Sequence, residues 1–232
     1  MSCVKVSATK TANAAVIFIH GLGDSGHGWS WFPQIVRQTG LVKNCDEINY
    51  VFPNAPTISV TANGGMRMPG WFDIYEFGNP EAKQDVAGFF KTCEHITSFI
   101  KTQVDEYKID PERIILGGFS QGSAISMAVL SLLEFKIGGL VALSGFCPVS
   151  QNILEKYETL SNKGANFDTP VFQGHGTDDP IIALKYGEHA SDFYKNLGFK
   201  KWDFRSYAGV PHSTNDEELV DAIKFMANIL NK

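Results

Sequence analysis

Short apolar runs alternate along the chain with longer segments in which apolar residues recur every three or four positions. Continuous apolar runs are typical of strands buried on both faces, whereas the longer spacing is typical of amphipathic helices. The segments predicted as strands are 14–20, 48–52, 113–116, 139–144, 170–173 and 201–207. The segments predicted as helices are 29–38, 79–107, 123–130, 183–197 and 214–230. This alternation predicts an α/β protein with a single, mostly parallel sheet and helices on both of its faces.

The predicted helix starts rest on local capping signals. Asn79-Pro80 combines a residue that caps free amide groups with one that suits a first helical turn. Thr214-Asn215-Asp216-Glu217 has the form of a capping box. The chain contains no internal repeat, low-complexity tract or linker, so residues 1–232 are expected to form one domain.

Residues 53–73 are predicted to form a long loop without regular structure. A loop of this length inside a compact domain is usually functional. Its apolar side chains either pack back on their own core or line a site for an apolar ligand, and the sequence leaves both alternatives open. They are Ile58, Val60, Met66, Met68, Trp71 and Phe72.

Composition narrows the class of protein. With 44% hydrophobic residues in a chain of 232, a packed globule is expected. The net charge of −5 and the lack of a basic run argue against a nucleic-acid partner. The four cysteines form no CxxC pair, which favours a reducing compartment and gives no support for a metal site. Residues 1–10 lack the apolar core of a secretory signal, so we expect a cytoplasmic protein, although Cys3 could carry an acyl chain.

The strongest chemical signal is Gly118-Phe119-Ser120-Gln121-Gly122, a serine between two glycines at a predicted strand-to-helix junction. A turn this sharp strains the central residue and tolerates little side-chain bulk two positions away on either side. It exposes the serine hydroxyl at a helix N-terminus, which is the arrangement of a nucleophilic serine. Ser120 is therefore the candidate nucleophile.

A serine hydroxyl needs an imidazole to accept its proton and a carboxylate to orient that imidazole. In folds with this turn, the acid and then the histidine follow the serine along the chain. His212, between the last predicted strand and helix, is the candidate base, since His20, His27 and His95 precede Ser120. The acid should follow strand 170–173. The residues leave Asp178 and Asp179 open, with a slight preference for Asp179 because it precedes Pro180.

An oxyanion hole requires two backbone amides. One should come from Gln121, next to the nucleophile, and the other from the glycine-rich loop after the first strand, where we assign Leu22. That loop, residues 21–26, also matches the GxGxxG dinucleotide pattern. The pattern needs an acidic residue at the end of the second strand, where Pro53 and Asn54 stand instead, so nucleotide binding is disfavoured.

Taken together, these segments resemble the acyl-protein thioesterase and lysophospholipase family of α/β-hydrolases over nearly the whole chain. The motifs that carry the resemblance are residues 20–29, 52–56, 68–73, 117–122 and 143–145, with the Asp179-Pro180 and His212 loops. The resemblance implies Ser120, Asp179 and His212 as the triad, and Leu22 and Gln121 as oxyanion donors. Gly70, where serine is expected, and Pro211, which is bulkier than expected, depart from the pattern.

The resemblance also implies a function. Family members remove palmitoyl groups from cysteines of cytosolic proteins, and many cleave lysophospholipids or small esters. We therefore expect a cofactor-free hydrolase of S-acylated proteins in the cytoplasm, with the nucleus as an additional location and with transient membrane contact. The alternative is a carboxylesterase or lysophospholipase. The side chains expected to bind the acyl chain are Ile58, Met66, Met68, Trp71 and Phe72.

Overall fold

A seven-stranded sheet lies at the centre of the computed structural model, which describes residues 1–79 and 82–232. The strand order is β1-β3-β2-β6-β7-β8-β9. Only β1 runs antiparallel to its neighbour within this sheet, so the predicted mostly parallel sheet is confirmed. The strands are β1 (Cys3–Val6), β2 (Ala14–Ile19), β3 (Ile48–Pro53), β6 (Ile114–Phe119), β7 (Gly139–Leu143), β8 (Val171–Gly176) and β9 (Trp202–Tyr207).

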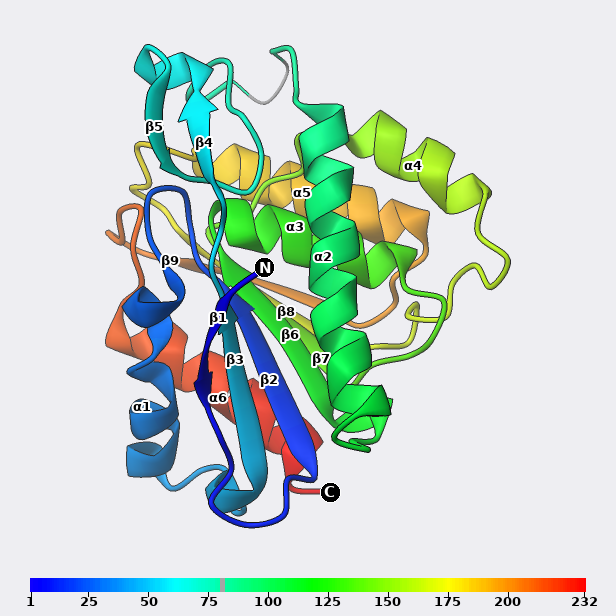
Figure 1. Cartoon of the computed structure of the whole chain (residues 1–232). Helices are drawn as coiled ribbons and strands as arrows, with labels where there is room; N and C mark the ends of the chain where they lie inside the picture. Colours follow the sequence, from blue (N-terminus) through cyan, green and yellow to red (C-terminus); the bar gives the residue numbers. More distant parts are fainter. Residues whose placement is uncertain (80–81) are drawn as a thin grey trace.

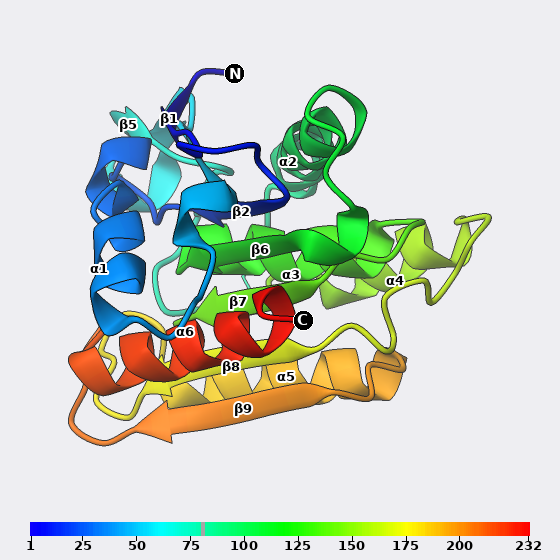
Figure 2. The ribbon, with the colours of Figure 1, turned by 90° about the horizontal axis from the view of Figure 1, so that it is seen from below.

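Helices cover both faces of the sheet (Figure 1). They are α1 (Phe32–Thr39), α2 (Val86–Asp105), α3 (Gln121–Leu132), α4 (Ser150–Glu158), α5 (Leu184–Leu197) and α6 (Asp216–Leu230). One core cluster joins the sheet to α2, α3, α4 and α5, and a second joins it to α1 and α6. Figure 2 shows α6 in front of β7 and β8, with α5 behind β8 and β9. Every residue of β2, β3, β7 and β8 is buried, because both faces are covered.

The segment 53–73 is not the irregular loop that we expected. It contains an antiparallel hairpin of β4 (Thr57–Val60) and β5 (Met66–Pro69). Gly64 and Gly65 form its turn with φ values of 62° and 78°, a conformation that glycine adopts without strain. Each strand is only four residues long and half exposed, so it lacks the continuous apolar run that marked the strands of the main sheet.

Helix α2 begins later than predicted. Its N-cap is Asp85, whose carboxylate accepts from the Gly88 amide at 2.9 Å and from the Asp73 amide at 3.1 Å. The predicted start at Asn79 is therefore wrong, and Pro80 lies outside the described residues. The cap of α6 is shifted by one position, since the Asn215 side chain accepts from the Glu218 amide at 2.8 Å. Acidic and amide residues are common in turns, so a capping residue alone does not locate a helix start.

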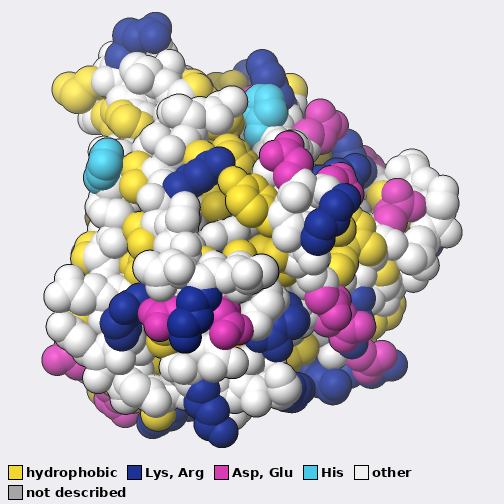
Figure 3. Space-filling view, turned by 60° about the horizontal axis from the view of Figure 1, so that its bottom comes forward, with side chains coloured by type: hydrophobic (Ala, Val, Ile, Leu, Met, Phe, Trp, Pro, Cys, Tyr) yellow, Lys and Arg dark blue, Asp and Glu magenta, His cyan; other side chains and the backbone are white. Residues whose placement is uncertain are grey.

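Strand β1 and helix α4 were not predicted from the sequence. β1 is four residues long, carries a lysine at Lys5 and is half exposed, as expected for an edge strand. In the part of the chain that the structure describes, no helix is long and apolar enough to cross a bilayer. On the face shown in Figure 3, lysine and arginine side chains are interspersed with acidic ones rather than gathered in one basic area.

Candidate active site

Ser120 occupies a strained turn between β6 and α3. Its φ and ψ are 56° and −119°, a region that non-glycine residues rarely adopt. The flanking glycines are required by crowding: a Cβ on Gly118 would lie 2.4 Å from the backbone of Gly122, and one on Gly122 would lie 2.1 Å from the Ile19 oxygen. The predicted intolerance of side-chain bulk at these two positions is confirmed.

His212 and Asp179 complete a hydrogen-bonded chain with Ser120. His212 Nε2 lies 2.9 Å from Ser120 Oγ, and His212 Nδ1 lies 2.7 Å from Asp179 Oδ2. A carboxylate can only accept, so Nδ1 carries the proton and leaves Nε2 free to accept from the serine hydroxyl. The three residues come from the loops after β6, β8 and β9, which are parallel and end at one edge of the sheet.

The Asp179 carboxylate is held in its charged form. Burial acts to raise its pKa, but hydrogen bonds from His212 and from the Ile182 and Ile181 amides outweigh burial, so the pKa lies below the ordinary value. Those amides donate to Oδ1 at 2.8 and 2.9 Å, which leaves Oδ2 for His212. Asp178 is exposed and accepts instead from the Thr177 hydroxyl. The geometry thus places Asp179, and not Asp178, against the imidazole.

Leu22 and Gln121, the expected oxyanion donors, border the same space. Both residues line the cavity in front of Ser120, and a Cβ on neighbouring Gly21 would lie 3.4 Å from Ser120 Cβ. Within residues 1–79 and 82–232, neither amide donates to a protein acceptor. Two free amides beside a serine hydroxyl can bind an oxyanion.

One polar network fixes the loop that carries Leu22. The His20 ring donates from Nδ1 to the Gly21 oxygen at 2.7 Å and accepts from the Ala55 amide at 3.1 Å. The Trp71 indole donates to the His20 oxygen at 2.7 Å, and the Trp71 amide donates to Gln121 Oε1 at 2.9 Å. These contacts tie the glycine-rich loop, the segment after the hairpin and α3 together, so His20 has a structural role here.

An apolar cavity of about 240 Å³ opens in front of Ser120 and His212. Its walls come from segments after β5 and β7 and from the start of α5. The principal apolar lining residues are Phe72, Ile74, Phe77, Phe146, Ile181 and Ile182.

The residues expected to bind an acyl chain lie mostly elsewhere. Phe72 lines the cavity and also a second hollow, whereas Ile58 and Trp71 line the second hollow and not the cavity. Trp71 is 2% exposed and belongs to the core, while Met66 is 61% exposed in the hairpin. Met68 is half-buried in β5 and, with Met66, is not among the residues of the described part that line either space. Of these five residues, Phe72 alone is on the wall of the Ser120 cavity, which the pattern of a loop could not indicate.

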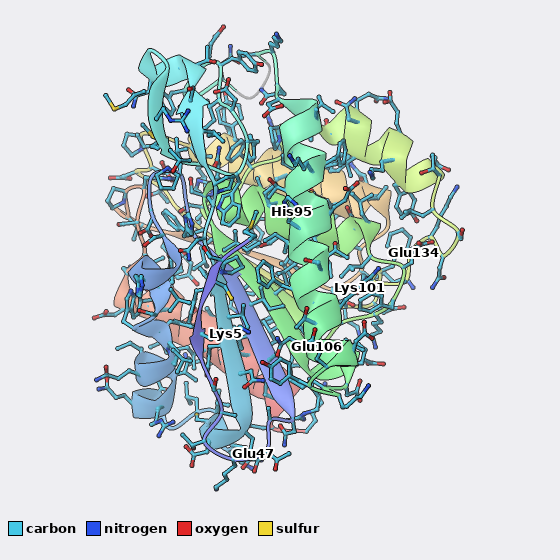
Figure 4. All side chains as sticks on the ribbon, viewed as in Figure 1. Lys5, Glu47, His95, Lys101, Glu106 and Glu134 are labelled. Atoms are coloured by element: carbon cyan, nitrogen blue, oxygen red, sulfur yellow. The ribbon has the colours of Figure 1, made fainter. Side chains whose placement is uncertain are left out.

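Other candidate residues also have defined places. His95 lies on α2 with Lys101, and Glu106 is the C-cap of that helix (Figure 4). His95 does not line the cavity. Asn54 stands at the end of β3, where a dinucleotide site needs an acid, and accepts from the Gly26 amide at 2.9 Å. The part of the chain that the structure describes holds no cluster of three metal-binding side chains.

Glu218 was missed by the sequence analysis. Its carboxyl is fully buried in the first turn of α6, with both oxygens unpaired within the described residues, and Oε1 would lie 2.2 Å from a Cβ on Gly174. Burial raises the pKa of this group to about 8. An acidic residue in a first helical turn is ordinary, so nothing in the sequence distinguished this glutamate from an exposed one.

The chain is similar to known proteins over nearly its whole length. Residues 2–230 match the profile of the family described as phospholipase/carboxylesterase. Acyl-protein thioesterase 1 of Debaryomyces hansenii is 57% identical, covering 99% of this chain and 97% of that protein. The enzyme of the same name from Candida albicans is 59% identical, covering 100% and 99%. The crystal structure of Zea mays acyl-protein thioesterase 2 superposes with a TM-score of 0.84 at 25% identity, covering 99% of both chains.

We predict that the two neighbouring aspartates differ sharply in importance. Asp179→Asn should lower kcat on the order of 10³- to 10⁴-fold, because an amide no longer selects the imidazole tautomer that accepts from serine. Asp178→Asn, at an exposed position, should stay within about twofold of wild type. Steady-state hydrolysis of a small chromogenic ester measures both, and a larger loss in Asp178→Asn would reverse the assignment.

We predict that Glu218 makes stability fall as the pH rises. Below pH 4.5 both folded and unfolded chains are protonated, whereas between pH 4.5 and about 8 only the unfolded chain loses this proton. Glu218→Gln should therefore melt at a higher temperature than wild type at pH 8, and the difference should shrink toward pH 4.5. Thermal unfolding of both proteins across this range is the test. Parallel curves would show that the carboxyl is not buried in a protonated form.

Proposed function

This chain belongs to the phospholipase/carboxylesterase family, and we propose that it is an acyl-protein thioesterase that hydrolyses long-chain thioesters on protein cysteines. The observation that carries the proposal is the Ser120–His212–Asp179 chain opening into an apolar cavity. This arrangement suits a substrate with a reactive carbonyl joined to a hydrocarbon chain. The full-length similarity to thioesterases favours the thioester over the carboxylesterase alternative.

The proposed reaction is acyl transfer through a covalent intermediate. Ser120 Oγ attacks the thioester carbonyl while His212 Nε2 takes the hydroxyl proton, and the Leu22 and Gln121 amides hold the oxyanion. The C–S bond then breaks, and the proton passes from His212 to the departing cysteine sulfur. A thiolate leaves readily, since its conjugate acid has a pKa of about 8.5. Water repeats the sequence on the acyl-serine and releases the fatty acid.

The cavity supplies binding energy for the acyl chain. Each methylene transferred from water to an apolar wall is worth about 0.8 kcal/mol. Phe72, Phe146 and Ile182 form buried parts of that wall, while Phe77 and Ile181 are 49% and 46% exposed at its rim. The exposed rim would let the acyl chain of an S-acylated protein enter the cavity, either from solution or from a membrane surface that the enzyme contacts transiently.

The proposed substrates are S-acylated proteins, with acyl esters and lysophospholipids as lesser ones, and the proposed location is the cytoplasm and the nucleus. No cofactor takes part in the proposed steps, since the described side chains and amides account for proton transfer and charge stabilisation.

The decisive experiment compares purified protein on a palmitoyl-cysteine peptide and on lysophosphatidylcholine, with Ser120→Ala as the blank. We expect a higher kcat/KM for the thioester and a loss on the order of 10⁶-fold in kcat for Ser120→Ala. Faster turnover of the lysolipid would favour the lysophospholipase alternative. Residual turnover near wild type in Ser120→Ala would exclude Ser120 as the nucleophile.

A second prediction concerns chain length. Phe77→Ala should raise KM for a palmitoyl substrate by about fivefold and leave acetyl-ester hydrolysis unchanged, because a short acyl group does not reach the rim. Met66→Ala is the matched control, since Met66 is equally apolar and more exposed but does not line the cavity. Equal losses on both substrates in Phe77→Ala would contradict an acyl-binding rim.

A further inference from the structure

A second imidazole lies beside the Asp179 carboxylate, and the proposed reaction does not use it. His175 belongs to β8, its side chain is fully buried, and its Nε2 lies 3.6 Å from Asp179 Oδ2, the oxygen that accepts from His212. Buried polar side chains are normally retained only where their hydrogen bonds compensate for desolvation. The contacts of this ring therefore indicate what it does.

The ring holds the acid loop closed through Ile182. His175 Nε2 donates to the Ile182 oxygen at 2.8 Å, and the Ile182 amide donates to Asp179 Oδ1 at 2.8 Å. Ile182 is thus bonded through its oxygen to His175 of β8 and through its amide to the Asp179 carboxylate, so both contacts fix the loop between β8 and Ile182. Because Oδ1 is fixed in this way, Oδ2 faces His212.

His175 acts as a neutral ring. Burial lowers its pKa, although the Ile182 hydrogen bond and the charges of Asp179 and Glu188 act in the opposite direction and His212 acts with burial. The contact with a carbonyl oxygen puts its proton on Nε2. A charged His175 would compete with His212 for Asp179 Oδ2, so a neutral ring keeps the carboxylate available.

Helix α5 leaves room for the ring at one position. Gly187 faces it, and a Cβ at Gly187 would lie 2.5 Å from His175 Nδ1. Gln173, on the same side of β8, donates to the Gly187 oxygen at 2.9 Å and keeps the helix close. The ring is therefore confined between α5 and the acid loop, with Nδ1 unpaired within the described residues.

We propose that His175 is a positioning residue for the catalytic acid: its Nε2–H holds the Asp179 loop through Ile182 so that Oδ2 stays on His212. The proposal rests on the proposed Ser120–His212–Asp179 chemistry, but it makes no assumption about the acyl group. Its test therefore uses a small acetyl ester and a fluorophosphonate, which report on the triad even if palmitoyl thioesters prove not to be substrates.

The test compares two substitutions of His175. In His175→Gln the side-chain amide can still donate to the Ile182 oxygen, so kcat per active site should stay within about threefold of wild type. His175→Leu fills the space but has no donor, and the loss of a buried hydrogen bond should lower kcat by about 10- to 100-fold with KM unchanged. Active sites are counted by fluorophosphonate titration, so that a lower folded fraction is not mistaken for lower kcat.

The pH profile separates positioning from general stability. A looser Asp179–His212 contact should move the acid limb of kcat/KM in His175→Leu by about one pH unit toward lower pH, whereas in His175→Gln the limb should stay in place. Misfolding would scale the whole profile without moving it. The proposal is overturned if His175→Leu retains wild-type kcat per active site and an unmoved acid limb, or if His175→Gln falls as far as His175→Leu.

A third variant changes a residue of α5 that faces the His175 ring and does not belong to the acid loop. Gly187→Ala removes no polar group but pushes on His175 Nδ1, so it should lower kcat and move the acid limb in the same direction as His175→Leu. The matched control on the same helix is His189→Gln, at an exposed position, which should leave both unchanged. A Gly187→Ala protein that unfolds at a lower temperature but keeps the wild-type acid limb would contradict the proposed link between ring and acid.

Discussion

The site depends on the crowding of backbone around one turn. Gly122 packs against the Ile19 oxygen of β2, and Gly118 packs against Gly122, so β6 enters α3 with no room for other side chains. This close approach forces Ser120 to a positive φ and directs its hydroxyl out of the sheet edge. Parallel strands then place the loops after β8 and β9 at that same edge, where Asp179 and His212 meet the serine.

The polar network around Trp71 explains why the Trp71 side chain is part of the core whereas the neighbouring Phe72 lines the cavity. Trp71 is anchored by His20 and Gln121, and the Gln121 side chain in turn donates from Nε2 to the Phe72 oxygen at 2.7 Å. The oxyanion loop and the cavity wall are therefore fixed by the same residues. A substitution at Trp71 would disturb transition-state stabilisation and acyl binding together, although its side chain does not line the cavity.

The sequence correctly predicted those strands that consist of continuous apolar runs. The buried strands follow from such runs, and the order of Ser120, Asp179 and His212 follows from the rule for folds that contain the turn around Ser120. The predicted irregular loop over residues 53–73 and the predicted start of α2 were wrong, because four-residue strands and single capping residues carry weak signals. The residues could not decide between Asp178 and Asp179, because that choice depends on which carboxylate the Ile181 and Ile182 amides turn toward the imidazole.

Several unfavourable features of the structure lie together near the ends of β6, β7 and β8. Ser120 and Ser144 adopt positive φ there, Ser144 Oγ and His175 Nδ1 are buried without partners in the described part, and Glu218 lies behind β8. Strained residues of this kind cost about 1–3 kcal/mol each. They persist because β7 and β8 are completely buried, β6 is buried except at Phe119, and all three are paired on both sides, which leaves the loops no alternative packing. The stability of the sheet thus offsets the cost of a strained serine, an unpaired buried carboxyl group and two imidazoles. Stabilising replacements at this edge should therefore reduce activity more than equivalent replacements elsewhere.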